Sequence, residues 1–249
     1  MVEIIVTLLG ACMGSFLNVC ICRIPYQESV VYKPSHCPQC EKKLGAMDLI
    51  PIFSYIFLKG RCRSCDEKIS IQYPLVELLT AVLFLATYLH WGWQWQTVSM
   101  WSFVSILIAV TVIDIYHQII PDKILLVGSL IGLPFIILSS FNQFISGIIG
   151  FFVAGLILLV IAVVSKGGMG GGDIKLAAVI GLFLGWQNAL LALFISFLAG
   201  GLIGIFLLVT KLKGRKDAVP FGPYLALGGL ISAFYGNQLI KWYLNISGL

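Results

Sequence analysis

Long apolar stretches without a charged residue restrict this chain to a membrane-spanning fold. A helix needs about 20 residues to cross the hydrocarbon core of a bilayer, which is about 30 Å thick. Two uncharged stretches are long enough for one helix each, residues 4–22 and 218–240. Three are long enough for two helices each, residues 78–113, 124–165 and 176–210. Only 11% of the residues are charged, against about 25% in soluble domains. A soluble enzyme is therefore excluded.

Polar, glycine or aromatic residues interrupt the three longest stretches. The interruptions are Trp91–Gln96, Ser139–Gln143 and Gly185–Asn188, and tryptophan rings in particular suit a boundary between lipid and water. We therefore predict an all-α polytopic membrane protein with about eight transmembrane helices in the lipid bilayer. An even number of spans places both termini on one face.

The distribution of Lys and Arg predicts the orientation, because these residues accumulate on the cytoplasmic side of a membrane. In the eight-helix arrangement all of the 16 Lys and Arg residues except Lys241 fall on one face. That face is expected to be cytoplasmic, with both termini outside. The basic run Lys211–Lys216 resembles a nucleic-acid-binding patch, but the same rule accounts for it, and no nucleic-acid partner is expected.

The only long polar segment, residues 23–74, carries two C-x-x-C pairs. Cys37, Cys40, Cys62 and Cys65 match the four thiolates of a tetrahedral, structural zinc site. Two disulfides or a redox-active pair are the alternatives, but a cytoplasmic location is reducing. His36 is a further possible ligand, although the four cysteines suffice. The chain thus divides into helix 1 (1–22), a zinc-binding domain (23–74) and a seven-helix membrane domain (75–249).

Two aspartates lie at the cytoplasmic ends of separate predicted helices. Asp114 is near the end of the third helix, and Asp173 opens the sixth. If these helices pack together, the carboxylates can share a proton, as the pair in an aspartic protease does. Intramembrane carboxylates also serve as proton or cation relays in transporters. From the residues alone, a peptidase and a transporter both remain open.

Residues around the two aspartates also have expected roles. Gly170 and Gly172 precede Asp173, and glycines let the backbone approach a substrate closely. Lys175 is expected to reach the interface, where it can also meet an anionic group of a substrate. Asp122 follows Pro121 and is expected to cap the fourth helix.

The order of the motifs resembles that of type IV prepilin peptidases. The matching motifs are Gly14–Val19 with Arg23–Pro25, the paired C-x-x-C, Tyr73–Glu77, Ile113-Asp114 through Ile120-Pro-Asp122, Gly170–Lys175 and Pro220–Pro223. The resemblance implies a GxGD-type intramembrane aspartic protease of the bacterial cytoplasmic membrane. Such enzymes cleave the leader from prepilins and pseudopilins of pilus, type II secretion and competence systems. It also implies that Asp114 and Asp173 are the catalytic pair and that Gly170 and Gly172 are the glycines of GxGD.

The same resemblance implies a second activity. Many members of the family methylate the new N-terminal amine with S-adenosylmethionine. No strand followed by G-x-G-x-x-G occurs here, so the sequence assigns no residue to this activity. The segment Gly14–Asn18 and the cysteine-containing loop are where such a site is expected.

Overall fold

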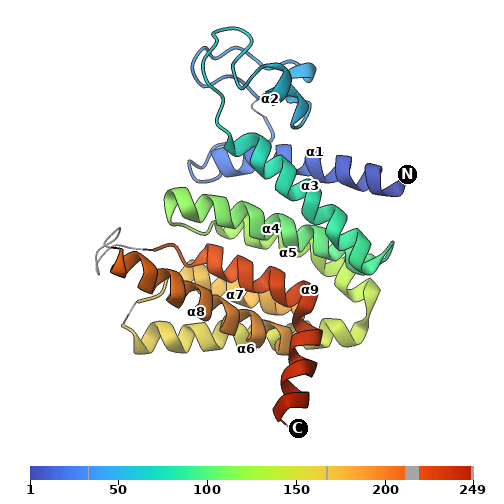
Figure 1. The fold of residues 1–249 in the computed structure, drawn as a ribbon, viewed down its shortest axis with the longest axis vertical. Coiled ribbons are helices and arrows are strands. Elements are labelled where there is room, and N and C mark those ends of the chain that lie inside the picture. Colours follow the sequence, from blue (N-terminus) through green and yellow to red (C-terminus); the bar gives the residue numbers. More distant parts are fainter. Residues whose placement is uncertain (33, 167, 211–218, 248–249) are drawn as a thin grey trace. The chain divides into compact units, whose positions relative to one another are not determined.

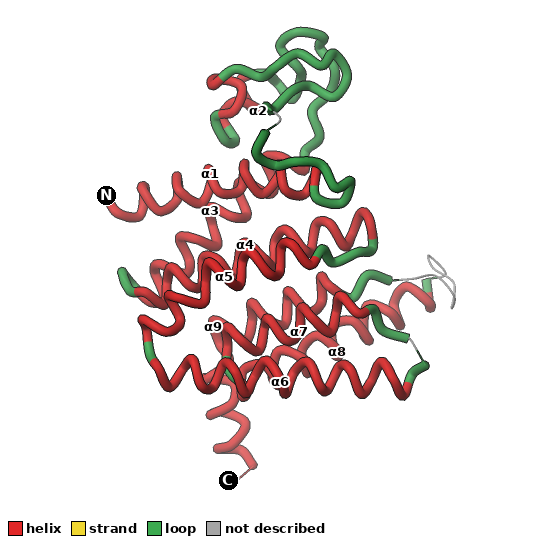
Figure 2. Tube along the Cα trace, turned by 180° about the vertical axis from the view of Figure 1, so that it is seen from behind, coloured by secondary structure: helices red, strands yellow, loops and turns green. Residues whose placement is uncertain are grey.

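The computed structural model describes residues 1–249 except 33, 167, 211–218 and 248–249. The basic run 211–216 therefore lies outside the described residues. The chain is helical, and no strand occurs in the described part (Figures 1 and 2). Its elements are α1 (Val2–Arg23), η1 (Ala46–Leu49), α2 (Phe53–Phe57), α3 (Gln72–Trp91), α4 (Trp95–His117), α5 (Asp122–Ser139), α6 (Phe141–Val164), α7 (Gly171–Leu184), α8 (Trp186–Val209) and α9 (Gly222–Ser247). The predicted all-α fold is confirmed.

The three interruptions in the apolar stretches each separate two helices. Gly92 ends α3 with a φ of 72°, and Gly185 lies between α7 and α8 with a φ of 80°. Both values belong to the region that glycine adopts without strain. Ser140 separates α5 from α6, and its hydroxyl accepts a hydrogen bond from the backbone N–H of Gln143. The ends of these helices were therefore readable from local sequence.

The helices differ in whether their length and composition allow them to cross a bilayer. Among the described residues, six helices are long and apolar enough to cross a bilayer: α1, α3, α4, α5, α6 and α8. The 14 residues of α7 are fewer than the roughly 20 that a full span needs. The chain is thus an integral membrane protein, while the count of eight spans stays a prediction.

The chain forms two compact units, residues 1–97 and 98–249. The first contains α1, α3 and the cysteine-containing segment between them. Here α1 and α3 pack backbone to backbone: a Cβ atom added to Gly10 would lie 2.8 Å from Cα of Ala81, and one added to Gly14 would lie 2.6 Å from Cα of Glu77. Small residues at this spacing allow such an approach. The contact brings the ends of α1 and α3 together beside the cysteines.

In the second unit, α7 lies at the centre and packs against α5, α6, α8 and α9. Seven residues between Leu176 and Phe183 are buried. The backbones of α6 and α7 cross so closely at Gly150 and Gly181 that a Cβ atom on either would overlap the other helix. This central position places the first turn of α7, with Asp173, among the ends of neighbouring helices.

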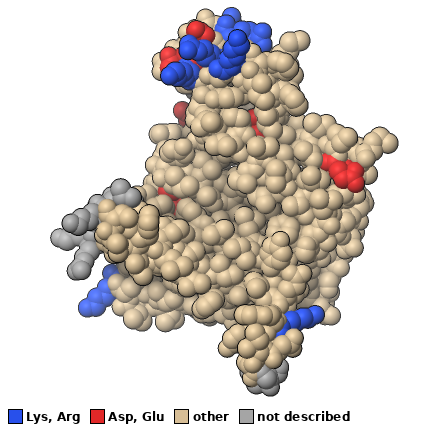
Figure 3. Space-filling view, in the orientation of Figure 1, with Lys and Arg blue, Asp and Glu red and all other residues tan. Residues whose placement is uncertain are grey.

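Charged side chains are concentrated in one part of the sequence. In Figure 3 most of the visible blue and red surface belongs to the segment between α1 and α3. The long helices instead expose large apolar side chains, including Ile4, Leu130, Phe152 and Phe206. Apolar surface of this extent is what lipid-facing helices present.

Candidate active site and metal centre

Asp114 is a buried carboxylate held by the start of another helix. It lies near the end of α4 and is 5% exposed. Its Oδ2 atom accepts a hydrogen bond of 2.9 Å from the backbone N–H of Gly222, the first residue of α9. The first N–H groups of a helix lack intrahelical partners and favour negative charge. The start of α9 therefore orients this carboxylate.

Gly222 leaves no space for a side chain at this contact. A Cβ atom added there would lie 2.7 Å from Oδ2 of Asp114. The sequence analysis quoted Pro220–Pro223 only as part of a resemblance and assigned Gly222 no role. Gly222 contacts Asp114, which lies more than a hundred residues earlier in the chain. The only local indication of a role for Gly222 was its position between Pro220 and Pro223.

We expect Gly222→Ala to lower peptidase activity about tenfold or more, because the added methyl group would displace the Asp114 carboxylate. Misplacement of a reacting group by about 1 Å can reduce the rate about 10²-fold. The measurement is the rate of prepilin cleavage by the purified variant. Gly204→Ala in α8 is the matched control, since no atom lies within 4 Å of a Cβ added at Gly204. Equal rates for both variants would show that Gly222 does not position Asp114.

Asp173 lies in the first turn of α7, and its Oδ2 accepts a hydrogen bond of 3.3 Å from the backbone N–H of Gly170. The charge of Asp114 acts on this carboxylate, so the two side chains lie within electrostatic range of each other. Asp114 and Asp173 thus each accept a hydrogen bond at Oδ2 from a backbone N–H of the second unit.

Gly172 has a packing role in the structure. A Cβ atom added to it would lie 2.8 Å from Cβ of Ile120, in the connection between α4 and α5. This glycine allows the start of α7 to approach that connection. The expectation that the glycines serve substrate approach stays untested.

Lys175 lies in α7, two residues after Asp173, and forms an ion pair with Asp122. Its Nζ atom lies 2.8 Å from Oδ1 and 2.7 Å from Oδ2 of Asp122. The expectation that Asp122 caps α5 is wrong: the N-cap is Pro121, no side chain caps this helix, and Asp122 is its first residue. The pair instead links the first residue of α5 to the second turn of α7. Both side chains are more than half exposed, so the pair contributes little stability by itself.

The four cysteines of the first unit form one cluster. The Sγ atoms of Cys37, Cys40, Cys62 and Cys65 all lie within 4.8 Å of one another, and those of Cys37 and Cys65 are 3.8 Å apart. Zinc–sulfur bonds of about 2.3 Å in a tetrahedron require sulfur atoms about 3.8 Å apart. Disulfide sulfurs would lie about 2.05 Å apart. The cluster thus fits a single metal ion, and His36 is not part of it.

Two equivalent turns supply the cysteines, and we call residues 35–44 the first knuckle and 60–69 the second. In each, the N–H of the first cysteine donates to a carbonyl five residues later, Cys37 to Lys42 at 3.0 Å and Cys62 to Glu67 at 2.8 Å. Glu41 and Asp66, which follow the second cysteines, both have positive φ, 54° and 61°. The shared backbone conformation explains why both pairs turn toward the same point.

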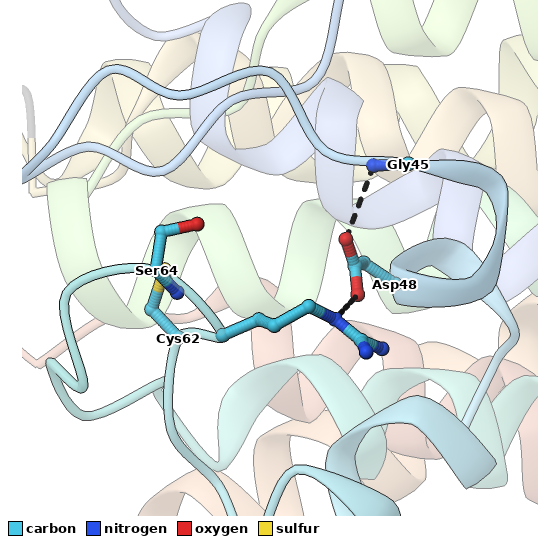
Figure 4. A network of polar contacts seen from close by, with 5 residues as sticks. Gly45, Asp48, Cys62 and Ser64 are labelled. Carbon is cyan, nitrogen blue, oxygen red and sulfur yellow. Dashed lines mark hydrogen bonds and ion pairs between the residues drawn. The ribbon is translucent and has the colours of Figure 1, made fainter.

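An ion pair connects the two halves of this segment (Figure 4). The Asp48 carboxylate accepts from the Gly45 N–H at 3.1 Å and from Nε of Arg63 at 2.8 Å. The Arg63 guanidinium holds the pKa of Asp48 below its usual value, so this carboxylate stays ionised at neutral pH. Beside it, the backbone N–H of Ser64 donates to Sγ of Cys62 and lowers the pKa of that thiol to about 7.

Two family models match the chain. The bacterial peptidase A24 N-terminal domain model matches residues 8–91, which include the four cysteines. The type IV leader peptidase family model matches residues 101–205, which include Asp114 and Asp173. Gly222 lies beyond both matches. No solved structure matches the chain significantly.

Curated relatives match over almost the whole length. A prepilin leader peptidase/N-methyltransferase of Bacillus subtilis is 38% identical over 247 residues, covering 98% of each chain. The protein of the same name from Aeromonas hydrophila is 35% identical, covering 96% of this chain and 93% of its own. That from Pseudomonas aeruginosa is 34% identical, covering 97% and 93%. With both family regions present and such identity along its full length, the chain belongs to the type IV leader peptidase family.

Proposed function

We propose that this protein cleaves the leader peptide of type IV prepilins or pseudopilins with Asp114 and Asp173, and methylates the new N-terminus with S-adenosylmethionine. The observation that carries the proposal is that the Asp114 carboxylate of α4 and the Asp173 carboxylate of α7 lie within electrostatic range of each other in one unit. A backbone N–H group holds each of them. The names of the full-length relatives support both activities.

The pair suits acid and base catalysis of peptide hydrolysis. Two nearby carboxylates share one proton, so one is ionised and the other protonated. The ionised member takes a proton from water, which then attacks the scissile carbonyl, and the protonated member donates to the carbonyl oxygen. The N–H groups of Gly222 and Gly170 keep the two Oδ2 atoms occupied. This orients both Oδ1 atoms for the water and the peptide.

The metal and the methyl donor have separate proposed roles. The four cysteines would hold a structural zinc ion, because four thiolates close the coordination shell. S-adenosylmethionine, when bound, would supply the methyl group for the new N-terminal amine. The cleavage and methylation chemistries thus need different groups of this chain.

The proposed location is the bacterial cytoplasmic membrane, with the cysteine segment and the aspartates on the cytoplasmic side and both termini outside. The one-sided distribution of Lys and Arg supports this orientation. A cluster of reduced cysteines also suits a reducing compartment. The alternative of an ion-coupled transporter has no support from the family to which the chain belongs.

Incubation of the purified protein in lipid nanodiscs with a prepilin tests the proposal directly. Without S-adenosylmethionine, mass spectrometry should show loss of the leader only. With it, the mature product should gain the mass of one methyl substitution. An intact prepilin would contradict the peptidase function, whereas a product whose mass never rises would remove methylation alone.

A further inference from the structure

An exposed apolar surface surrounds the short helix α2, in the stretch of chain that connects the two knuckles. We call residues 46–58, which include η1 and α2, the α2 segment. Its large apolar side chains point out of the first unit: Met47 is 74% exposed, Phe53 53%, Ile56 61% and Phe57 81%. Grouped apolar side chains of this kind mark surfaces that contact another protein or a membrane. The peptidase chemistry uses none of them.

The buried side chain of Glu77 fixes the start of α2 against α3. Its Oε2 atom accepts a hydrogen bond of 2.7 Å from the backbone N–H of Ile52, the N-cap residue of α2. Ile52 has a φ of 64°, which a β-branched residue adopts only with strain. Strained backbone persists where the surrounding structure holds it in place. The contact therefore holds the start of α2 at the level of the second turn of α3.

This level of α3 corresponds to the surface of a bilayer. The helix has 20 residues and is apolar enough to cross the membrane. It is about 30 Å long, which matches the thickness of the hydrocarbon core, so its second turn lies close to the boundary between headgroups and hydrocarbon. Leu75, Leu78 and Leu79 in the first two turns are each about half exposed. The apolar surface of the α2 segment therefore continues the exposed apolar surface of α3.

Charge is distributed unevenly over the cysteine-containing segment. In Figure 3 its blue and red side chains gather on one side, and most of the rest of its visible surface is tan. The α2 segment contains a single charged residue, Asp48, whose carboxylate is mostly buried and paired with Arg63 at 2.8 Å. Separation of apolar and aromatic side chains from charged ones is typical of elements that lie in the surface of a membrane.

We propose that the α2 segment inserts into the surface of the bilayer beside α3, with Phe53, Ile56 and Phe57 among the lipid chains. Lipid is favoured over a protein partner because the surface is continuous with that of α3, and because the bilayer adjoins such a helix with or without a substrate. Burial of these side chains in lipid removes apolar area from water. The cysteine cluster is thus attached to the membrane by the α2 segment as well as by α1 and α3.

Photocrosslinking from Phe57 identifies what covers the α2 segment. The full-length Phe57→p-benzoylphenylalanine variant keeps an aromatic side chain at an exposed position, so it should fold. It is placed in nanodiscs of phosphatidylcholine and phosphatidylglycerol, irradiated and digested with trypsin. Mass spectrometry should show phospholipid attached to the peptide of residues 44–59.

Gln39→p-benzoylphenylalanine is the matched control, because Gln39 is exposed in the first knuckle beside charged residues. We expect about tenfold more lipid adduct from position 57 than from position 39. Equal yields would overturn the proposal. So would crosslinks from position 57 to residues 98–249 or to a second copy of the chain in place of lipid. Crosslinks that transfer from lipid to an added prepilin would show that the surface binds substrate instead.

Hydrogen exchange provides a second test that needs no crosslinker. In the same nanodiscs, Phe57→Asp should raise the amide exchange rates of α2 about tenfold, because a charge is costly within the lipid and drives the segment out. Phe57→Leu stays apolar and should exchange like the wild type. A side chain that is already 81% exposed and surrounded by water would tolerate both changes equally. Identical exchange in the two variants would therefore contradict insertion.

Discussion

Asp114→Asn and Asp173→Asn are each expected to reduce prepilin cleavage by about 10³-fold or more. One carboxylate must act as the base and the other as the acid, and an amide does neither. Because the pair acts as a unit, the double variant should be little worse than either single one. The measurement is the single-turnover rate of leader removal. The variants should fold, since asparagine preserves the shape of aspartate and, at Asp114, removes a charge from a buried position.

Asp122→Asn is the matched control for this experiment. Its carboxylate lies at the start of α5 and pairs with Lys175 on the exposed surface, so its loss should leave substantial activity. The wild-type pH profile should be bell-shaped, with apparent pKa values that belong to the pair. An active Asp114→Asn together with an inactive Asp122→Asn would mean that the catalytic site lies around the start of α5.

The cysteine cluster is expected to hold about one zinc ion per chain. Serine at Cys37, Cys40, Cys62 or Cys65 should abolish stoichiometric binding and leave residues 24–71 open to proteolysis, because a segment with so little core depends on its metal. Metal analysis by mass spectrometry and limited proteolysis measure the two effects. Peptidase activity should fall less than the resistance to protease, since Asp114 and Asp173 lie in the second unit.

Cys12→Ser provides the control for these changes. Cys12 lies in α1, is exposed and is not part of the cluster, so the variant should keep its metal and its protease resistance. Full zinc content in a Cys37→Ser or Cys62→Ser protein would disprove the assignment. Complete loss of zinc with no change in the digestion pattern would contradict the structural role of the metal, because the metal would then not support the segment.

Features encoded over short distances were readable from the sequence. Apolar stretches of span length predicted the helices, and glycine or serine between them predicted where α3, α5 and α7 end. Two C-x-x-C pairs predicted one cluster, which the structure confirms as a group able to hold a metal. Residue type and depth also singled out Asp114 and Asp173. In each case the signal lies within a few residues, because helix formation and metal-ligand spacing are local.

Contacts between distant segments were not readable in the same way. The bond from Gly222 to Asp114, the pairing of Asp122 with Lys175, and the unpartnered Oδ1 of Asn18 each depend on which helix ends meet. The 14 residues of α7 are also fewer than the roughly 20 that a full span needs. The sequence by itself determined the membrane class, the helical segments and the chemical groups available. Only the tertiary structure decided which backbone N–H holds the Asp114 carboxylate and which polar atoms are buried without a partner, because helix packing depends on the close approach of surfaces that are far apart in the chain.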